Sequence, residues 1–245
     1  MIDIETASFS PISTRSLKDA FMERFESLIL SGKFSPGERV PSERELGALF
    51  GVSRPVVHEG LRTLESRGLV TIESRRGVRI NDYRREGSIE MLLSILNYTG
   101  GKLSVPLFDG ILEMRRLFEV ETARLAAKRR TTSQLADLRV VLAREKTGMT
   151  VSAKEIAAID YDFHLSIAIA SGNAIYPLLM NSFRRIYSNI LESFFSDASV
   201  VEPVFVFHGR LVDAVAACDE SLAGNLMVDL LGFSERNLRR LVQHP

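Results

Sequence analysis

Residues 41–80 read PSERELGALF GVSRPVVHEG LRTLESRGLV TIESRRGVRI, and this stretch decides the fold of the first third of the chain. Ser42 precedes an apolar-periodic run and Glu45 follows three residues later, the spacing of a capping box at a helix start. Gly51 is placed to end that helix, because glycine readily adopts a positive φ. Ser53 is then expected to cap a second helix.

Apolar residues mark the buried face of each expected helix: Leu46, Leu49 and Phe50 in the first, and Val57, Leu61 and Leu64 in the second. Gly68 is expected to end the second helix. Two short helices joined by a tight glycine turn form a helix-turn-helix pattern.

A hairpin with a cationic tip is expected directly after the second helix. Residues 69–72 are strand formers, residues 75–77 form a basic turn, and residues 78–80 alternate like a returning strand. A helix for the major groove beside a basic loop for phosphates is a DNA-binding arrangement. The pattern therefore predicts a winged helix-turn-helix.

The run GKFSPGERVPSERELGALFGVSRPVVHEGLRTLESRGLV resembles the winged helix-turn-helix of GntR-type bacterial transcription regulators. The resemblance covers roughly residues 15–80 and includes PSERELG, GVSR and the glycine of the wing. His58 stands where that family more often shows Arg, so the base preference at this contact is open.

The early positions of both helices reach phosphates and base edges in such a motif, although Arg44 and Arg54 also suit ordinary solvated charges. The expected DNA-contacting residues are Ser42, Arg44, Ser53, Arg54, Val56, His58, Arg75, Arg76 and Gly77.

Composition limits the protein to a soluble globular class. The 245 residues are 45% hydrophobic and 25% charged, and the net charge is +0, divided as +2 for residues 1–85 and −2 for the remainder. DNA binding must therefore rest on local placement of charge. The single cysteine, Cys218, excludes an internal disulfide and a Cys-rich zinc finger. No signal peptide or membrane-spanning run is visible, so a cytoplasmic protein without membrane partners is expected.

The chain is expected to be mainly α, with the winged helix-turn-helix followed by an all-α bundle of about seven helices. The expected divisions are a mobile N-terminus (1–13), the DNA-binding domain (14–81), a linker (82–87) and a helical effector-binding and dimerisation domain (88–245). Helical periodicity marks residues 88–98, 107–125, 135–144, 156–170, 175–195, 204–217 and 222–241.

The C-terminal part resembles the FadR branch of the same family, whose ligand-sensing region is the FCD domain. The runs EMRRLFEVETARLAA, DYDFHLSIAIASGN and HGRLVDAV carry this resemblance, which covers roughly residues 85–242.

Asp160 and His164 are four residues apart and therefore share one face of a helix, which neighbouring apolar residues place toward the interior. Such a pair needs partners when buried, and a divalent metal such as zinc or nickel is one, with His208 as a third ligand. The resemblance implies one Asp and three His, but the last His is replaced at Leu230. The alternative is an intrahelical Asp–His pair with His208 as a satisfied core residue.

Two further residues are effector-binding candidates, which makes the full set Arg115, Asp160, His164, Asn173 and His208. The resemblance implies that Arg115 grips a ligand carboxylate, whereas its spacing equally suits an ion pair with Glu119. Asn173 precedes a helix and suits capping better than ligand contact.

The sequence thus predicts a ligand-responsive repressor that binds palindromic operator DNA as a homodimer. A small organic acid is the favoured effector, and acyl-CoA in a metal-free apolar cavity is the alternative. The rival class is a metal-dependent enzyme using Asp160, His164 and His208, but no Ser-His-Asp order, phosphate loop or CxxC supports catalysis.

Overall fold

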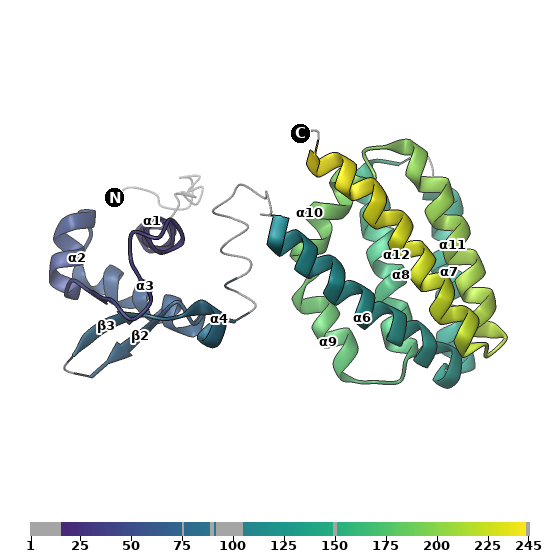
Figure 1. The fold of residues 1–245 in the computed structure, drawn as a ribbon, viewed down its shortest axis with the longest axis horizontal. Helices are drawn as coiled ribbons and strands as arrows, with labels where there is room; N and C mark the ends of the chain where they lie inside the picture. Colours follow the sequence, from purple (N-terminus) through teal and green to yellow (C-terminus); the bar gives the residue numbers. More distant parts are fainter. Residues whose placement is uncertain (1–15, 75, 89–90, 92–104, 149–150, 244–245) are drawn as a thin grey trace, which may run out of the picture. The chain divides into compact units, whose positions relative to one another are not determined.

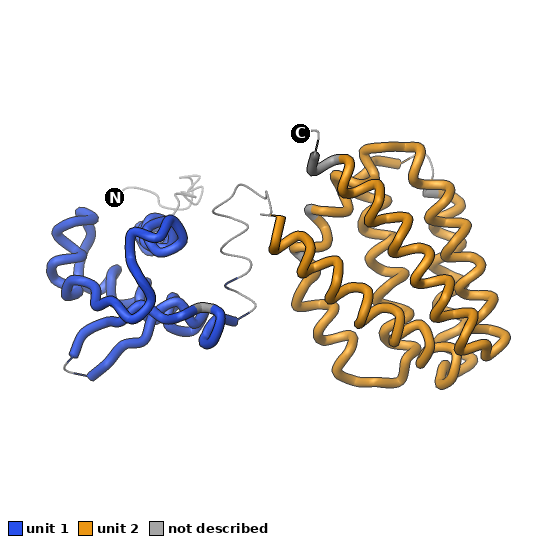
Figure 2. The backbone as a smooth tube through the Cα atoms, viewed as in Figure 1, with its two compact units in different colours: residues 1–100 blue, residues 101–245 orange. Residues whose placement is uncertain are grey.

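The protein is described from a computed structural model (Figure 1), in which residues 16–74, 76–88, 91, 105–148 and 151–243 are described. The chain divides into two compact units, residues 1–100 and residues 101–245 (Figure 2). The expected mobile N-terminus lies outside the described residues, and so does the expected helix over residues 88–98 apart from Ser88 and Met91.

The N-terminal unit combines short helices with a small sheet. Its elements are α1 (Leu17–Leu30), β1 (Arg39–Val40), α2 (Glu43–Phe50), α3 (Arg54–Ser66), β2 (Val70–Glu73), β3 (Gly77–Ile80) and α4 (Tyr83–Glu86). The strands are antiparallel in the order β1-β3-β2, with Thr71 opposite Arg79 in the hairpin register. The predicted helix-turn-helix and wing are confirmed, while β1 was missed because two residues carry no readable alternation.

Local capping explains where α2 begins and ends, but a side-chain cap does not start α3. Ser42 and Glu45 form the predicted capping box, and Gly51 ends α2 with φ 66°. Ser53 occupies the N-cap of α3, but the expectation that its side chain caps the helix was wrong. Pro55 explains this difference, because it stands at the second helical position and lacks one of the two N–H groups that an N-cap oxygen accepts from.

The core of the N-terminal unit forms where α1, α2 and α3 meet the sheet. Phe21 and Phe25 from α1 stack on each other and meet Phe50 of α2. Leu46 is buried, whereas Leu49 is 73% exposed, so the expectation that Leu49 joins the core was wrong. Consecutive residues of a helix point in directions about 100° apart, so Leu49 and Phe50 cannot both face the core on this narrow contact.

The segment expected to be a linker, residues 82–87, contains the one-turn helix α4. The Asp82 carboxylate accepts the backbone N–H of Arg84, which starts the turn, and the N–H of Ser88 donates to Arg67 O. Because these contacts are polar, the apolar periodicity of the sequence could not predict them. The residue division at 82–87 stays a prediction.

The C-terminal unit is all-helical. Its elements are α6 (Val105–Arg129), α7 (Thr132–Gly148), α8 (Ala153–Ala170), α9 (Ile175–Ser182), α10 (Arg184–Phe194), the 3-10 turn η2 (Ala198–Val200), α11 (Val201–Ala216) and α12 (Glu220–Gln243). Helix α6 runs along α12, and α8 packs against α6, α7 and α10 (Figure 1). We refer to residues 105–243 as the bundle.

One expected helix is divided in two. The periodicity over residues 175–195 predicted a single helix, but Phe183, with φ −92° and ψ −1°, separates α9 from α10. No Gly or Pro marks the break, so the apolar pattern continues through it unchanged. Among the described helices, none has the length and apolar character needed to cross a membrane.

Gly68 and Gly51 provide a matched test of the fold of the N-terminal unit. Both have positive φ, but a Cβ at Gly68 would lie 2.0 Å from Glu86 O, whereas a Cβ at Gly51 meets nothing within 4 Å. We expect Gly51→Ala to cost about 1–2 kcal/mol of left-handed strain. Gly68→Ala should cost about 1–3 kcal/mol more through the clash. Hydrogen exchange of the N-terminal unit measures both, and equal effects would contradict the close packing of α4.

Candidate functional site

The start of α3 presents two ionisable side chains to solvent. The side chain of Arg54 is 75% exposed and that of His58 is 49% exposed. The two residues are four positions apart, so they lie on the same face of α3. This face of α3 is therefore accessible to solvent.

Both side chains are joined by Glu43 at the start of α2, a residue that the sequence did not single out. Glu43 Oε2 accepts a 3.0 Å hydrogen bond from Arg54 Nε, and Oε1 lies 2.7 Å from His58 Nδ1. The hydrogen bond with His58 is the largest influence on the pKa of Glu43 and lowers it; burial opposes this shift, and the hydrogen bond from Arg54 adds to it, so the pKa lies below its usual value. Only the packing of α2 on α3 brings these groups together, so no local signal could have revealed the bridge.

The other expected DNA contacts are distributed over the same unit. Ser42 is committed to the capping box, Arg44 and Ser53 are exposed, and Val56 is half-buried against the core. At the wing, Arg76 and Gly77 are exposed, while Arg75 lies outside the described residues. The exposed members are available to a nucleic acid, whereas Val56 has part of its surface already covered.

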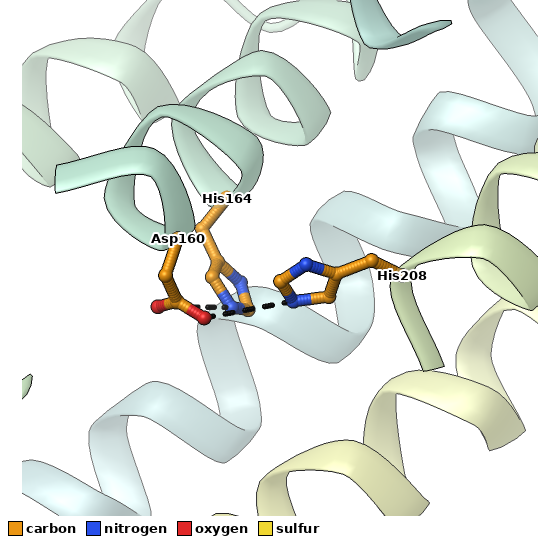
Figure 3. A group of neighbouring side chains, drawn as sticks. All are labelled: Asp160, His164 and His208. Atoms are coloured by element: carbon orange, nitrogen blue, oxygen red, sulfur yellow. Dashed lines mark ion pairs between the residues drawn. The ribbon is translucent and has the colours of Figure 1, made fainter. Parts of the chain in front are cut away.

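The bundle contains a second cluster, which we call the buried centre: Asp160 and His164 of α8 and His208 of α11. Figure 3 shows the two imidazoles and the carboxylate turned toward one another. The Nε2 atoms of His164 and His208 lie 3.9 Å and 3.6 Å from Asp160 oxygens. All three residues are buried, and one ligand-type atom from each lies within 4.8 Å of the others.

The far side of each imidazole meets another carboxylate. His208 Nδ1 is hydrogen-bonded to Glu145 Oε1 of α7 at 2.6 Å. His164 Nδ1 lies 2.6 Å from Glu119 Oε2 of α6, an ion-pair contact that lacks hydrogen-bond alignment. Glu145 was not singled out from the sequence, although it follows the buried Leu138 and Val141 at helical spacing. A charged residue on an apolar stripe was the signal that could have found it.

Glu119 contacts three side chains beside the buried centre: His164, Arg115 and Tyr187. It accepts hydrogen bonds from Arg115 Nε at 2.7 Å and from Tyr187 Oη at 2.8 Å. Burial raises the pKa of a carboxyl, but the charges of Arg115 and His164 outweigh it and hold the pKa of Glu119 well below its usual range. Burial lowers the pKa of His164, yet the contact with Glu119 and the charge of Asp160 together outweigh it, so this pKa is raised.

The charge balance of the interior fits a divalent cation. Asp160, Glu119 and Glu145 bring three carboxylates and Arg115 brings one guanidinium. An excess of two negative charges therefore remains when both imidazoles are in the neutral form that binds a metal, and a proton on His164 would offset one of them. Unbalanced buried charge is costly, and a divalent ion would neutralise it. In addition, Asp160 Oδ2 and His208 Nε2 are buried without a hydrogen-bond partner among the described residues. The donor set of one carboxylate and two imidazoles suits zinc or nickel.

Arg115 and Asn173 are already engaged within the protein. The guanidinium of Arg115 is paired with Glu119 and lies 4.8 Å from the centroid of the Tyr187 ring. The cavity that it lines is about 10 Å³, room for about one water molecule. Asn173 Oδ1 accepts the backbone N–H of Ile175 at 2.9 Å, so it forms the turn that begins α9.

Two larger grooves border the bundle. One, of about 610 Å³, is lined mainly by apolar side chains of α6, α9 and α10, including Phe118, Leu179 and Phe183, with Tyr187 at its inner wall. The other, of about 400 Å³, lies between α7 and α11 and is lined by Glu145, Phe205 and Gly209 among others. Tyr187 and Glu145 therefore connect the polar cluster to the two grooves.

Two family models match this chain, one in each of its two compact units. Residues 17–80 match the bacterial regulatory proteins of the gntR family, and residues 110–233 match the FCD domain. The Mycobacterium tuberculosis (strain CDC 1551 / Oshkosh) "HTH-type transcriptional regulator Mce2R" is 28% identical over 231 residues, 94% of this chain and 95% of the relative. The Shewanella amazonensis "Fatty acid metabolism regulator protein" is 33% identical over 183 residues, 75% and 74% of the two chains.

Solved structures share the fold. The Listeria monocytogenes protein described as Lar, which "controls the expression of the Listeria monocytogenes agr system", matches with a TM-score of 0.59 at 16% identity over 94% of this chain and 99% of that one. Escherichia coli McbR/YncC matches with a TM-score of 0.53 at 16% identity over 93% and 99%. The two family matches account for the N-terminal winged helix-turn-helix and for the bundle that holds the buried centre. The chain therefore belongs to the GntR family of bacterial transcription regulators and carries an FCD domain.

Proposed function

We propose that this regulator is a repressor that binds palindromic operator DNA as a homodimer and responds to a small organic acid held at a divalent metal, zinc or nickel, in the bundle. The observation that carries the effector proposal is the buried centre. Asp160, His164 and His208 turn their ligand-type atoms toward one another in the buried interior of the bundle, where the carboxylates outnumber the one guanidinium.

The exposed start of α3 supports the DNA-binding part of the proposal. Arg54 and His58 occupy successive turns of one helix face, and the hairpin tip adds Arg76. A short recognition helix contacts only a few base pairs, so two symmetry-related heads are needed to read an operator. A palindromic site and a dimeric protein follow from the same geometric requirement.

Leu230 stands where the resemblance implies a fourth metal ligand, and this bears on the effector proposal. Leu230 is buried and has no donor atom, so Asp160, His164 and His208 supply three ligands. Zinc sites with three protein ligands keep a position for water or substrate. A carboxylate of a small organic acid is suited to that position, because it is an anionic oxygen ligand. The bound cation would supply the charge that attracts it.

A second candidate effector is a fatty-acid-type molecule such as acyl-CoA, bound without a metal. Two observations favour it: the mainly apolar groove of about 610 Å³ beside α6, and the 33% identity to a protein named for fatty acid metabolism. Glu113 and Glu121 also line that groove, and their charges disfavour an anionic head group there. The acid-and-metal proposal therefore remains the first, and the enzyme alternative is set aside because the family consists of transcription regulators.

Either effector must act through a difference in affinity. A ligand that binds two arrangements of the DNA-binding heads equally shifts nothing, so the effector has to favour one arrangement. A coupling free energy of about 1–3 kcal/mol changes operator affinity by roughly 5–150-fold.

Arg54→Ala should weaken binding to DNA from the protein's own upstream region by roughly 10–100-fold, since one bidentate base contact contributes about 1–3 kcal/mol. Fluorescence anisotropy at fixed salt measures the affinity. Arg62→Ala, at the exposed far end of the same helix and about 12 Å away along its axis, is the control and should change affinity little. An Arg54→Ala variant with wild-type affinity and sequence preference would show that α3 does not read DNA in this way.

Sedimentation at micromolar protein should give a species of twice the 27.4 kDa chain mass, with or without operator. The reason is the two-fold requirement of a palindromic site. A single 27.4 kDa species at that concentration would contradict the homodimer.

Elemental analysis of the purified protein should find close to one zinc or nickel ion per chain, and a chelator should lower the melting temperature. Binding to the folded state alone stabilises by about 2.7 kcal/mol at a hundred times the dissociation constant. His208→Asn should remove this response, whereas His58→Gln, in the other unit, should keep it. A screen of small carboxylates and acyl-CoAs, with and without chelator, then identifies the effector class.

The same screen decides between the two candidates. A metal-free protein whose melting ignores zinc, nickel and chelator would eliminate the metal proposal. Stabilisation by long-chain acyl-CoA alone would establish the fatty-acid-type alternative in its place.

A further inference from the structure

The orientation of the His208 ring is fixed by two contacts that do not involve Asp160. Glu145 Oε1 lies 2.6 Å from His208 Nδ1 in a hydrogen bond between α7 and α11, 63 residues apart in the chain. Phe163 stacks on the ring with centroids 3.7 Å apart and an interplanar angle of 10°. Stacking sets the plane of the ring, and the hydrogen bond sets which nitrogen faces which way within that plane.

The hydrogen bond also fixes the tautomer. An ionised carboxylate only accepts hydrogen bonds, so Nδ1 must carry the proton toward Glu145. The Nε2 lone pair is then directed to the other side, where Asp160 Oδ1 lies 3.6 Å away. Nε2 has no hydrogen-bond partner among the described residues, although His208 is fully buried. A buried lone pair without a donor is an open ligand position.

Glu119 faces the Nδ1 side of His164 in a similar position, through an ion-pair contact rather than an aligned hydrogen bond. Its Oε2 lies 2.6 Å from His164 Nδ1, and Nε2 of the same ring lies 3.9 Å from Asp160 Oδ2. Arg115 and Tyr187 hold the other oxygen of Glu119 in place. Each imidazole therefore stands between one outer carboxylate at Nδ1 and the shared Asp160 at Nε2.

We propose that Glu145, and in parallel Glu119, are positioning residues that hold His208 and His164 with their Nε2 atoms free to bind a divalent cation. This assignment rests on the proposed metal-dependent function and deepens it. Outer carboxylates orient ligating imidazoles and raise their basicity, and their removal typically costs about 10–100-fold in metal affinity. With Leu230 in place of a fourth ligand, the three remaining ligands depend more strongly on this support.

Glu145→Gln is the sharpest test, because His208 is the one side chain that the structure records bonded to Glu145 among the described residues. The substitution keeps the shape of the side chain and removes its charge. We expect zinc affinity, measured in the full chain by competition with a chromophoric chelator, to fall roughly 10–100-fold. The visible absorption of the cobalt(II)-loaded protein should change as well, because the basicity and tautomer of a direct ligand have changed.

Glu202→Gln is the matched control. Glu202 is exposed and lines the same 400 Å³ groove as Glu145, so its loss removes one negative charge nearby without touching an imidazole. Zinc affinity and the cobalt spectrum should stay at wild-type values in this variant. Equal weakening in both variants would show a general charge effect and overturn the positioning role.

Glu119 is not used for the test, because Glu119→Gln would leave Arg115 buried without its carboxylate and could unfold the bundle. Folding of the Glu145 variant is checked separately. Metal-free Glu145→Gln should retain the circular dichroism of the wild type. If it does not fold, Glu145→Asp, which keeps the charge but shortens the reach by one methylene, replaces it and should bind zinc more weakly than wild type. Wild-type affinity and spectrum in the folded variant would overturn the inference alone. Failure of the wild type to bind zinc would overturn the metal proposal together with it.

Discussion

Three carboxylates, one guanidinium and two imidazoles are enclosed together in the bundle, and their charges must be balanced without water. Asp160, Glu119 and Glu145 are each no more than 3% exposed. In a low-dielectric interior each unpaired charge carries a desolvation cost of several kcal/mol. Five helices contribute to this polar cluster: α6, α7, α8 and α11 provide the charged groups and imidazoles, and α10 provides Tyr187, which donates to Glu119.

Two residues of this polar cluster, Tyr187 and Glu145, also line grooves at the surface of the bundle. Glu119 accepts from Tyr187 Oη, and Tyr187 lines the apolar groove of about 610 Å³. Glu145 forms part of the wall of the second groove. A change of charge at the buried centre would therefore alter the hydrogen bonding of residues that border both grooves. Packed helices respond to such changes by shifting between discrete arrangements, because a close-packed core does not deform continuously.

The N-terminal unit uses the opposite arrangement of charge. Glu43, Arg54 and His58 lie at its surface, where water screens them and an individual ion pair contributes little to stability. Their contacts instead fix the positions of the Arg54 and His58 side chains relative to α2. The bridge from Glu43 holds two side chains of α3 together through exposed hydrogen bonds. Stability comes instead from the apolar contacts of Phe21, Phe25 and Leu46 beneath them.

Local pattern alone determined the helix-turn-helix, the wing and the shared face of Asp160 and His164. Capping boxes, a glycine at positive φ and a spacing of four residues are properties of a few neighbouring residues, so the sequence states them directly. Tertiary structure alone decided that α7 brings Glu145 to His208, that Glu43 bridges Arg54 and His58, and that Arg115 pairs inward with Glu119. It also decided that Leu49 stays outside the core. The first two are contacts between separate helices, and the last two depend on which helix face finds a partner. The physical reason is that periodicity fixes the face on which a residue lies, but only packing fixes what that face meets.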